Sequence, residues 1–165
     1  METLTEENKK EFRYAGFWLR FVAYLIDYFI LQFAGLILSL PFIGGIILSA
    51  IKLGNNPLDE GMTFLGVAGI FCFVLMIVLI NLLLGWLYFA FMQSSRTQAT
   101  LGKMALNLAV TDLGGYRITF GRATARYFSK IISNMTMYIG YILAGITEKK
   151  QALHDMIAGT LVIKK

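Results

Sequence analysis

Three polar side chains near the start of the chain are the first candidates for chemistry. Arg20, Tyr24 and Asp27 interrupt a stretch that is otherwise apolar. Positions four and seven apart lie on one face of an α-helix, so the three form one polar stripe that should face protein. A carboxylate deep in a membrane costs about 2.5–3.5 kcal/mol, so Asp27 needs a partner or a proton. The stripe predicts either a proton or cation site or a structural ion pair.

A second pair of residues, His154 and Asp155, suggests hydrolase or metal chemistry. The chain has one histidine and one cysteine, which removes most metal sites and catalytic triads. Neighbouring side chains diverge in a helix or strand, and no nucleophile is identifiable beside the pair. We therefore predict no enzyme activity, no metal and no cofactor. Asp155 is instead expected to cap a helix or turn, or to pair with a cation. Three basic residues are candidates for that pairing: Arg96, Lys103 and Arg20.

The elements that position these residues are membrane helices. Hydrophobic residues make up 57% of the 165 residues and charged residues 15%, whereas a soluble domain is about a quarter charged. Residues 17–40 and 64–92 are each long enough to cross a hydrocarbon core of roughly 30 Å at about 1.5 Å per residue. Residues 42–51 continue past Pro41 as a bent extension or an interfacial segment. Residues 52–63 gather turn formers and charges, which predicts a loop in water.

Basic residues near the ends of the spans predict their orientation. The loop at residues 52–63 holds one basic residue, whereas residues 93–130 hold six. Because cytoplasmic loops carry the excess of lysine and arginine, residues 93–130 are predicted to be cytoplasmic. Lys9, Lys10 and Arg13 precede the first span, so the N terminus is predicted to be cytoplasmic too. In the second span, Asn81 is expected to hydrogen-bond across helices as a structural contact.

A third apolar segment, from Tyr127 to about residue 147, leaves two alternatives open. It could cross the membrane once, but polar residues dilute it and the crossing would export a lysine-rich tail, against the charge rule. The alternative is a re-entrant or interfacial helical hairpin. Its amphipathic leg would reach about Met137, and a short return leg would reach Ile146. Such a hairpin is tolerated only where protein covers it.

A small cytoplasmic β-hairpin is predicted at about residues 105–120. Apolar residues alternate with polar or small ones over residues 106–110 and again over 116–120, and residues 112–115 (DLGG) supply a turn. Residues 160–163 are apolar and mostly β-branched, so they could add a third strand that supports the hairpin. That pairing requires a cytoplasmic tail and favours the re-entrant alternative. The expected fold is a mainly α membrane protein with one domain over residues 1–165.

Basic residues at four-residue spacing after the hairpin predict contacts with lipid. Arg122, Arg126 and Lys130 form one stripe of a helix that can lie on anionic headgroups. With this stripe, the net charge of +5 indicates a lipid surface rather than nucleic acid as partner. Gly102-Lys103 resembles the end of a nucleotide-binding phosphate loop. It lacks the first glycine and the final Ser/Thr, so no nucleotide site is predicted.

Three segments resemble the RDD family of bacterial membrane proteins: AGFWLRFVAYLID (15–27), QATLGKMALNLAVTDLGGYRITFGRATAR (98–126) and QALHDMIAGTLVIKK (151–165). Together they extend the resemblance over almost the whole chain. The family is named for one arginine and two aspartates, and the matching positions here are Arg20, Asp27 and Asp155. The resemblance implies a multi-pass protein of the bacterial cytoplasmic membrane. Sodium/proton exchange has been proposed for some members.

Two functions follow from these predictions. In the first, an accessory protein binds and regulates another membrane protein, such as a membrane-bound protease or a transporter. Its C-terminal strand would then add to a partner's sheet edge or occupy a peptide-binding cleft. In the alternative, a cation/proton (sodium/proton) exchanger uses Asp27 as its site, with Arg20 tuning the pKa and Asp155 at the cytoplasmic mouth. Two or three spans without internal repeats would need a homo-oligomer to build that pathway. The expected partners are membrane lipids, and another membrane protein or further copies of this chain.

Overall fold

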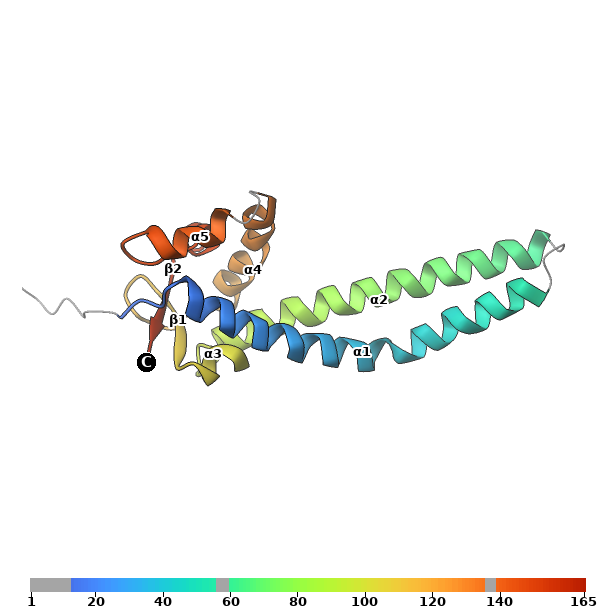
Figure 1. Ribbon diagram of the computed structural model, residues 1–165, viewed down its shortest axis with the longest axis horizontal. Helices are drawn as coiled ribbons and strands as arrows, with labels where there is room; N and C mark the ends of the chain where they lie inside the picture. Colours follow the sequence, from blue (N-terminus) through green and yellow to red (C-terminus); the bar gives the residue numbers. More distant parts are fainter. Residues whose placement is uncertain (1–12, 56–59, 136–138) are drawn as a thin grey trace, which may run out of the picture. The chain divides into compact units, whose positions relative to one another are not determined.

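The computed structural model describes residues 13–55, 60–135 and 139–165. Lys9, Lys10 and Met137, which entered the predictions above, lie outside these residues. The chain separates into two compact units. Unit 1 combines the residues up to Asp27 with Phe89–Lys165, and unit 2 is Tyr28–Tyr88. The described elements, coloured along the chain in Figure 1, are α1 (Phe17–Asn55), α2 (Glu60–Ser94), α3 (Leu101–Ala105), β1 (Leu108–Asp112), α4 (Phe120–Met135), α5 (Ile139–Ile146), α6 (Leu153–Ile157) and β2 (Thr160–Lys164).

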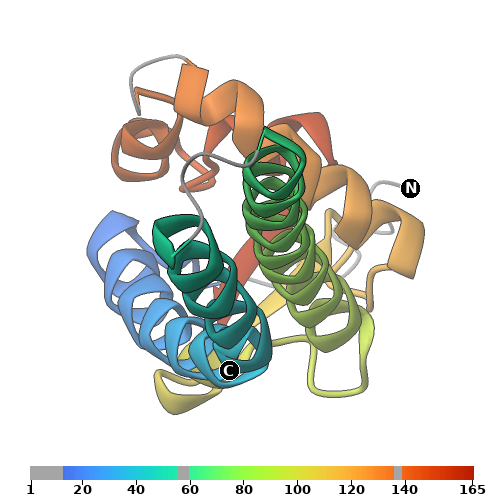
Figure 2. The same cartoon turned by 90° about the vertical axis from the view of Figure 1, so that its right-hand side faces the viewer.

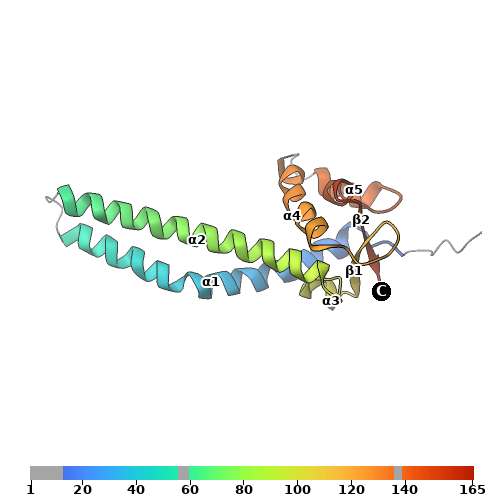
Figure 3. The same cartoon turned by 180° about the vertical axis from the view of Figure 1, so that it is seen from behind.

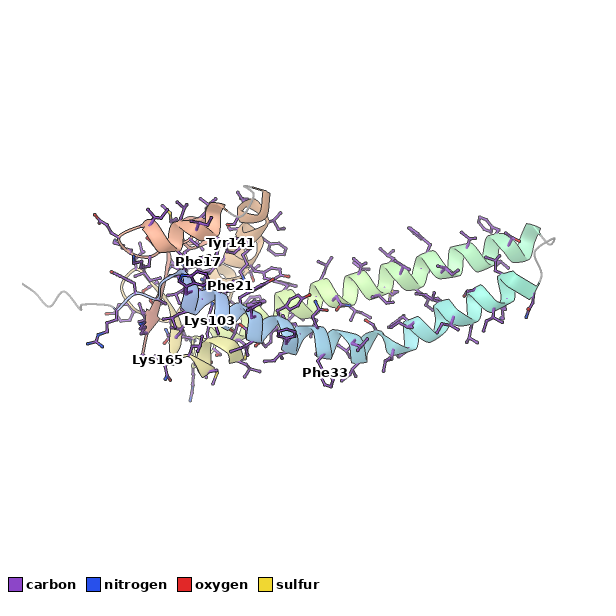
Figure 4. The ribbon with its side chains drawn as sticks, viewed as in Figure 1. Phe17, Phe21, Phe33, Lys103, Tyr141 and Lys165 are labelled. Atoms are coloured by element: carbon purple, nitrogen blue, oxygen red, sulfur yellow. The ribbon has the colours of Figure 1, made fainter. Side chains whose placement is uncertain are left out.

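Two helices have the length and apolarity to cross a membrane. They are α1 and the part of α2 from Thr63 to Ser94, which confirms the two predicted spans as long apolar helices. The predicted extension at residues 42–51 belongs to α1, which contains Pro41 and continues to Asn55. Large apolar side chains cover the exterior of both helices, for example Phe33 at 69% exposed (Figure 4). Such a surface is stable when lipid or another apolar partner covers it.

Within unit 2, α1 and α2 run antiparallel and side by side, as Figures 1 and 2 show from two directions. The contacts depend on glycines. A Cβ added at Gly35 would lie 2.2 Å from Asn81 Oδ1, and one added at Gly45 would lie 2.7 Å from the Phe73 ring. Small residues at such positions let two apolar helices approach closely. Asn81 Nδ2 donates to Ser39 Oγ at 3.3 Å, which confirms the predicted contact across helices.

The sheet of unit 1 differs from the predicted hairpin. β1 pairs antiparallel with β2, and Val110 lies opposite Val162 in this register. The expected turn does form, since Gly115 N–H donates to Asp112 O at 3.1 Å. After the turn, however, the return segment contributes only an isolated bridge at Thr111–Arg117, so the prediction of a second hairpin strand at residues 116–120 was wrong.

Burial and capping explain this choice of strand partner. The β2 residues Thr160, Leu161 and Val162 are at most 2% exposed, whereas Tyr116 on the return segment is 72% exposed. The β2 pairing therefore buries three consecutive residues of the strand, whereas on the return segment Ile118 is buried and Tyr116 is not. Thr119 Oγ1 also accepts from Arg122 N–H at 3.3 Å, as an N-cap residue does, so the chain enters α4 where a strand would have continued.

The third apolar region is divided between two helices. α4 ends at Met135 and α5 begins at Ile139. An eight-residue helix such as α5 is about 12 Å long at 1.5 Å per residue, well short of a crossing. Among the described residues, α1 and α2 are the two helices that meet the requirements of a span, so a third span is not shown.

Candidate functional site

Asp155 is the centre of a buried ionic cluster in unit 1. Its carboxylate is 0% exposed and pairs with two arginines, Arg20 from the start of α1 and Arg126 from α4. Arg126 Nε donates to Asp155 Oδ1 at 2.8 Å. In addition, Ala152 N–H donates to Asp155 Oδ2 at 3.2 Å at the start of α6. Asp155 therefore both caps a helix and pairs with Arg20, which are two of the roles expected for it.

The two arginines also hydrogen-bond to neighbouring segments of the chain. Arg20 also donates to the carbonyl oxygens of Ala15 and Lys150. Arg126 Nη1 donates to Gln93 Oε1 at 2.9 Å near the end of α2. Because a planar guanidinium offers several donors at fixed angles, each arginine sets the relative positions of three chain segments. Burial alone would raise the pKa of Asp155, but the adjacent Arg126 and Arg20 hold that pKa well below its usual range.

Asp27 belongs to a separate contact, between α1 and α3. Thr100 Oγ1 donates to Asp27 Oδ2 at 2.6 Å, and Gly102 N–H donates to Asp27 Oδ1 at 2.7 Å. The Asp27 carboxylate thus accepts from the hydroxyl and the backbone at the beginning of α3, in the manner of an N-cap. Gly102 is required for this approach, since a Cβ there would lie 2.1 Å from Ala23 O.

The polar stripe predicted along α1 is divided in the structure. Arg20 pairs with Asp155, and Asp27 accepts from Thr100, just before α3, so the two charged residues of the stripe have different partners. Tyr24, between them in sequence, is 50% exposed. The spacing placed the three residues correctly on one helix. Their partners come from segments about 75 and 135 residues further along the chain, which spacing within a helix cannot indicate.

Ser133, His154 and Asp155 form a hydrogen-bonded row that resembles a catalytic triad. Ser133 Oγ lies 3.4 Å from His154 Nδ1, and His154 Nε2 lies 3.3 Å from Asp155 Oδ1. Burial, more than any other cause, lowers the pKa of His154 to about 3, so the ring is a weak base at neutral pH. Ser133 is 0% exposed, and a Cβ added at Gly140 would lie 3.0 Å from its Oγ. Ser133 is therefore closely packed in the described residues, and His154 is a weak base.

The three basic residues of the predicted headgroup stripe on α4 differ in burial and in their partners. Arg122 is exposed, with its Nη1 3.8 Å from Asp112 Oδ2. Arg126 is 3% exposed and committed to Asp155 and Gln93, so its predicted contact with headgroups is not compatible with the structure. Lys130 is half-buried, with Nζ 3.8 Å from the centroid of the Phe89 ring.

Sequence reasoning missed the residues that complete the cluster. Gln93 and Arg126 are buried members of the Asp155 cluster, and Thr100 is buried and donates to Asp27 in the separate contact with α3. One available signal was the run of small residues on α4. Ala123, Ser129 and Ser133 share a face with Arg126, and such a face can pack closely enough to bury a guanidinium.

These features define a class of protein: a membrane protein with two long apolar helices and an ionic cluster made of one aspartate and two arginines. The sequence model of the RDD family matches residues 14–159, and the chain belongs to that family. The match includes Arg20, Asp27 and Asp155, the three residues that the resemblance assigned to the family's arginine and two aspartates.

The chain is also similar in sequence to bacterial proteins. The chain is 36% identical to the uncharacterized protein YxaI of Bacillus subtilis, over 92% of this chain and 97% of the relative. It is 31% identical to the uncharacterized membrane protein YteJ of the same organism, over 91% of this chain and 80% of the relative. A shorter match, 41% identical over 66 residues, joins it to the uncharacterized protein RP437 of Rickettsia prowazekii. No solved structure matches the chain.

Proposed function

We propose that this protein is a non-enzymatic accessory protein of the bacterial cytoplasmic membrane that binds and regulates another membrane protein, such as a membrane-bound protease or a transporter. The observation that supports this proposal is the commitment of both aspartates to the fold. Asp155 is paired with two arginines, and Asp27 accepts from Thr100 and Gly102. Those donors would have to leave before either carboxylate bound a cation. The basic residues of unit 1 favour a cytoplasmic location for it.

The C-terminal strand is a poor choice for the partner contact. β2 pairs with β1 along one edge, and on the other edge Ala15 N–H donates to Val162 O at 2.9 Å. Adding this strand to a partner's sheet would require it to leave its own. The turn after β1 is the better candidate, because Leu113 and Tyr116 are 56% and 72% exposed.

Ion flux through the purified protein separates the accessory function from the exchanger. The measurement is proton and sodium flux in liposomes that contain the protein alone, as wild type and as Asp27→Asn. We expect flux no higher than in protein-free liposomes for both, and a lower thermal stability for Asp27→Asn. Flux in the wild type that disappears in folded Asp27→Asn would establish the exchanger and refute the accessory function.

Crosslinking in cells tests the partner directly. A photo-crosslinking residue at Tyr116 is expected to capture another membrane protein. The matched control is the same residue at Phe33, which is similarly exposed but lies on the apolar surface of unit 2, and it is expected to capture no such protein. Adducts between copies of this chain alone, at either position, would contradict regulation of a different protein.

A further inference from the structure

Two lysines of unit 1 form no ion pair with a carboxylate of the described residues. Lys103, in α3, is 9% exposed and is labelled in Figure 4. Over residues 13–55, 60–135 and 139–165, its ammonium takes part in neither a hydrogen bond nor an ion pair. Lys130, in α4, also forms neither a hydrogen bond nor an ion pair in the described residues. It does contact two aromatic rings: its Nζ lies 3.8 Å from the Phe89 centroid and 5.8 Å from the Tyr127 centroid. Aromatic faces attract a cation but do not cancel its charge.

The surroundings of these lysines are positively charged overall. The cations Arg20, Lys103, Arg126 and Lys130 interact with one another and with two carboxylates, Asp27 and Asp155. The remaining titratable neighbour, His154, is neutral at pH 7, since burial lowers its pKa to about 3. Both arginine charges are directed at Asp155. The four cations exceed the two carboxylates by two positive charges, and the two lysines are the members of this group that form no ion pair in the described residues.

Burial and neighbouring positive charges both disfavour the charged form of the two lysines. Burial, followed by the charges of Arg126 and Lys130, lowers the pKa of Lys103 well below its usual range. Burial and Arg126 likewise lower the pKa of Lys130 to about 8. An ammonium that is taken out of water without a counter-ion costs several kcal/mol, and an anion between the two would offset that cost.

We propose that Lys103 and Lys130 bind a phosphate-bearing anion in unit 1, either the headgroup of an anionic phospholipid or a free phosphate. Phosphate oxygens accept charge-assisted hydrogen bonds, and lysine acts as a point charge toward them. The α4 surface also offers apolar contacts to a lipid, because Phe128, Ile131 and Ile132 are each about half exposed. This site goes beyond the predicted headgroup stripe: it adds Lys103 from another helix and leaves out Arg126.

Native mass spectrometry of the full chain in nanodiscs tests the site. The nanodiscs contain either phosphatidylglycerol or phosphatidylcholine. We expect phosphatidylglycerol to remain bound to the wild type, and Lys103→Gln and Lys130→Gln each to weaken its binding about tenfold, the loss typical of one charge-assisted contact. The matched control is Lys149→Gln, which removes the same charge from an exposed position and should change binding less than about twofold. Equal retention of the two lipids would exclude a lipid as the source of the phosphate, and equal lipid retention together with no effect of soluble anions would overturn the proposal.

Soluble anions distinguish the two sources of phosphate. Inorganic phosphate and glycerol 3-phosphate are added at millimolar concentration to protein in neutral detergent, and thermal unfolding is followed. Stabilisation that requires both lysines would assign the site to free phosphate. Stabilisation by phosphatidylglycerol but not by these anions would assign it to lipid. The proposal is overturned when neither class stabilises the protein.

A second measurement uses only the wild type, so it does not depend on the folding of a variant. Lysines carrying ¹³C-methyl groups report their own titration by NMR. Addition of the bound anion is expected to raise the pKa of Lys130 from about 8 toward its ordinary value, because a negative charge favours the ammonium. An unchanged Lys130 titration in the presence of phosphatidylglycerol and of phosphate would overturn the site.

Discussion

Different forces stabilise the interior of each of the two units. In unit 1 the buried residues include charged and hydrogen-bonding side chains such as Asp27, Gln93, Arg126 and Asp155. In unit 2 the helices pack through glycines, and Asn81 of α2 donates a side-chain hydrogen bond to Ser39 of α1. Directional bonds fix one arrangement of segments that lie far apart in sequence, whereas shape alone fixes an antiparallel helix pair. Single substitutions should therefore cost much more in unit 1 than in unit 2.

The largest effect is expected for Asp155→Asn. The amide cannot balance Arg20 and Arg126, and an uncompensated buried charge costs about 3–5 kcal/mol. The measurement is thermal unfolding of the purified protein in detergent, with limited proteolysis to locate the loosened unit. Glu148→Gln is the matched control, because it removes a carboxylate from an exposed position and should be close to neutral. If the two variants proved equally stable, the ionic cluster would not be what holds unit 1 together.

A smaller loss, about 2–3 kcal/mol, is expected for Gly102→Ala, since the added methyl group meets backbone that cannot rotate away. Its Cβ would lie 2.1 Å from Ala23 O and 3.0 Å from Asp27 Cγ. The matched control is Gly121→Ala, where no atom lies within 4 Å and alanine favours the helix. Thermal unfolding of the two variants should shift in opposite directions. A Gly102→Ala protein as stable as Gly121→Ala would show that α3 does not need its close approach to α1.

Acid should weaken unit 1 through His154. The pKa of this residue is lowered by burial to about 3 in the fold and is about 6.5 in an unfolded chain. The unfolded state therefore binds the additional proton between pH 6.5 and pH 3. His154 costs no stability above pH 6.5, and stability is lost as the pH falls through that window. The loss from pH 7 to pH 5 is about 2 kcal/mol.

The test of this pH effect is the difference between two proteins, since other groups also titrate. The wild type should lose about 2 kcal/mol more than His154→Gln on moving from pH 7 to pH 5. Asp155, whose pKa is lowered, contributes below its unfolded value of about 3.9, so the two groups act in separate pH ranges. Parallel stability curves for the two proteins would contradict a neutral, buried His154.

The sequence predicted the structure of unit 2 more completely than that of unit 1. Both long helices were predicted from apolar length, and the Asn81 contact from a polar residue deep in a span, because unit 2 depends on features that are local in sequence. β1 was predicted by alternation, and residues 160–163 were predicted as an added third strand. The choice of β2 over residues 116–120 as the partner of β1 was not predicted, since it depends on burial in the folded unit.

The residues of the ionic cluster were also predicted only in part. Arg20, Asp27 and Asp155 were identified as important residues, while Arg126 was assigned to the surface because α4 was read as a basic amphipathic helix. In the structure α4 buries its small and polar face, with Arg126 and Ser133 inside, and exposes Phe128, Ile131 and Ile132. Hydrophobic periodicity gives the two faces of a helix but not which of them faces protein when lipid is available as an apolar solvent.

The smallest effect is expected in unit 2, for Asn81→Leu. The substitution removes the hydrogen bond to Ser39 and keeps a side chain of similar size, and contacts of this kind are worth about 0.6 kcal/mol in a membrane. Gly35 has no Cβ, and this leaves room for Asn81 Oδ1. The branched leucine side chain must fit into the same space. Thermal unfolding in detergent should therefore fall only slightly, with Leu82→Ala, on an exposed position of the same helix, as the control. A loss as large as that of Asp155→Asn would mean that directional bonding governs unit 2 as well, and the contrast between the two units would not hold.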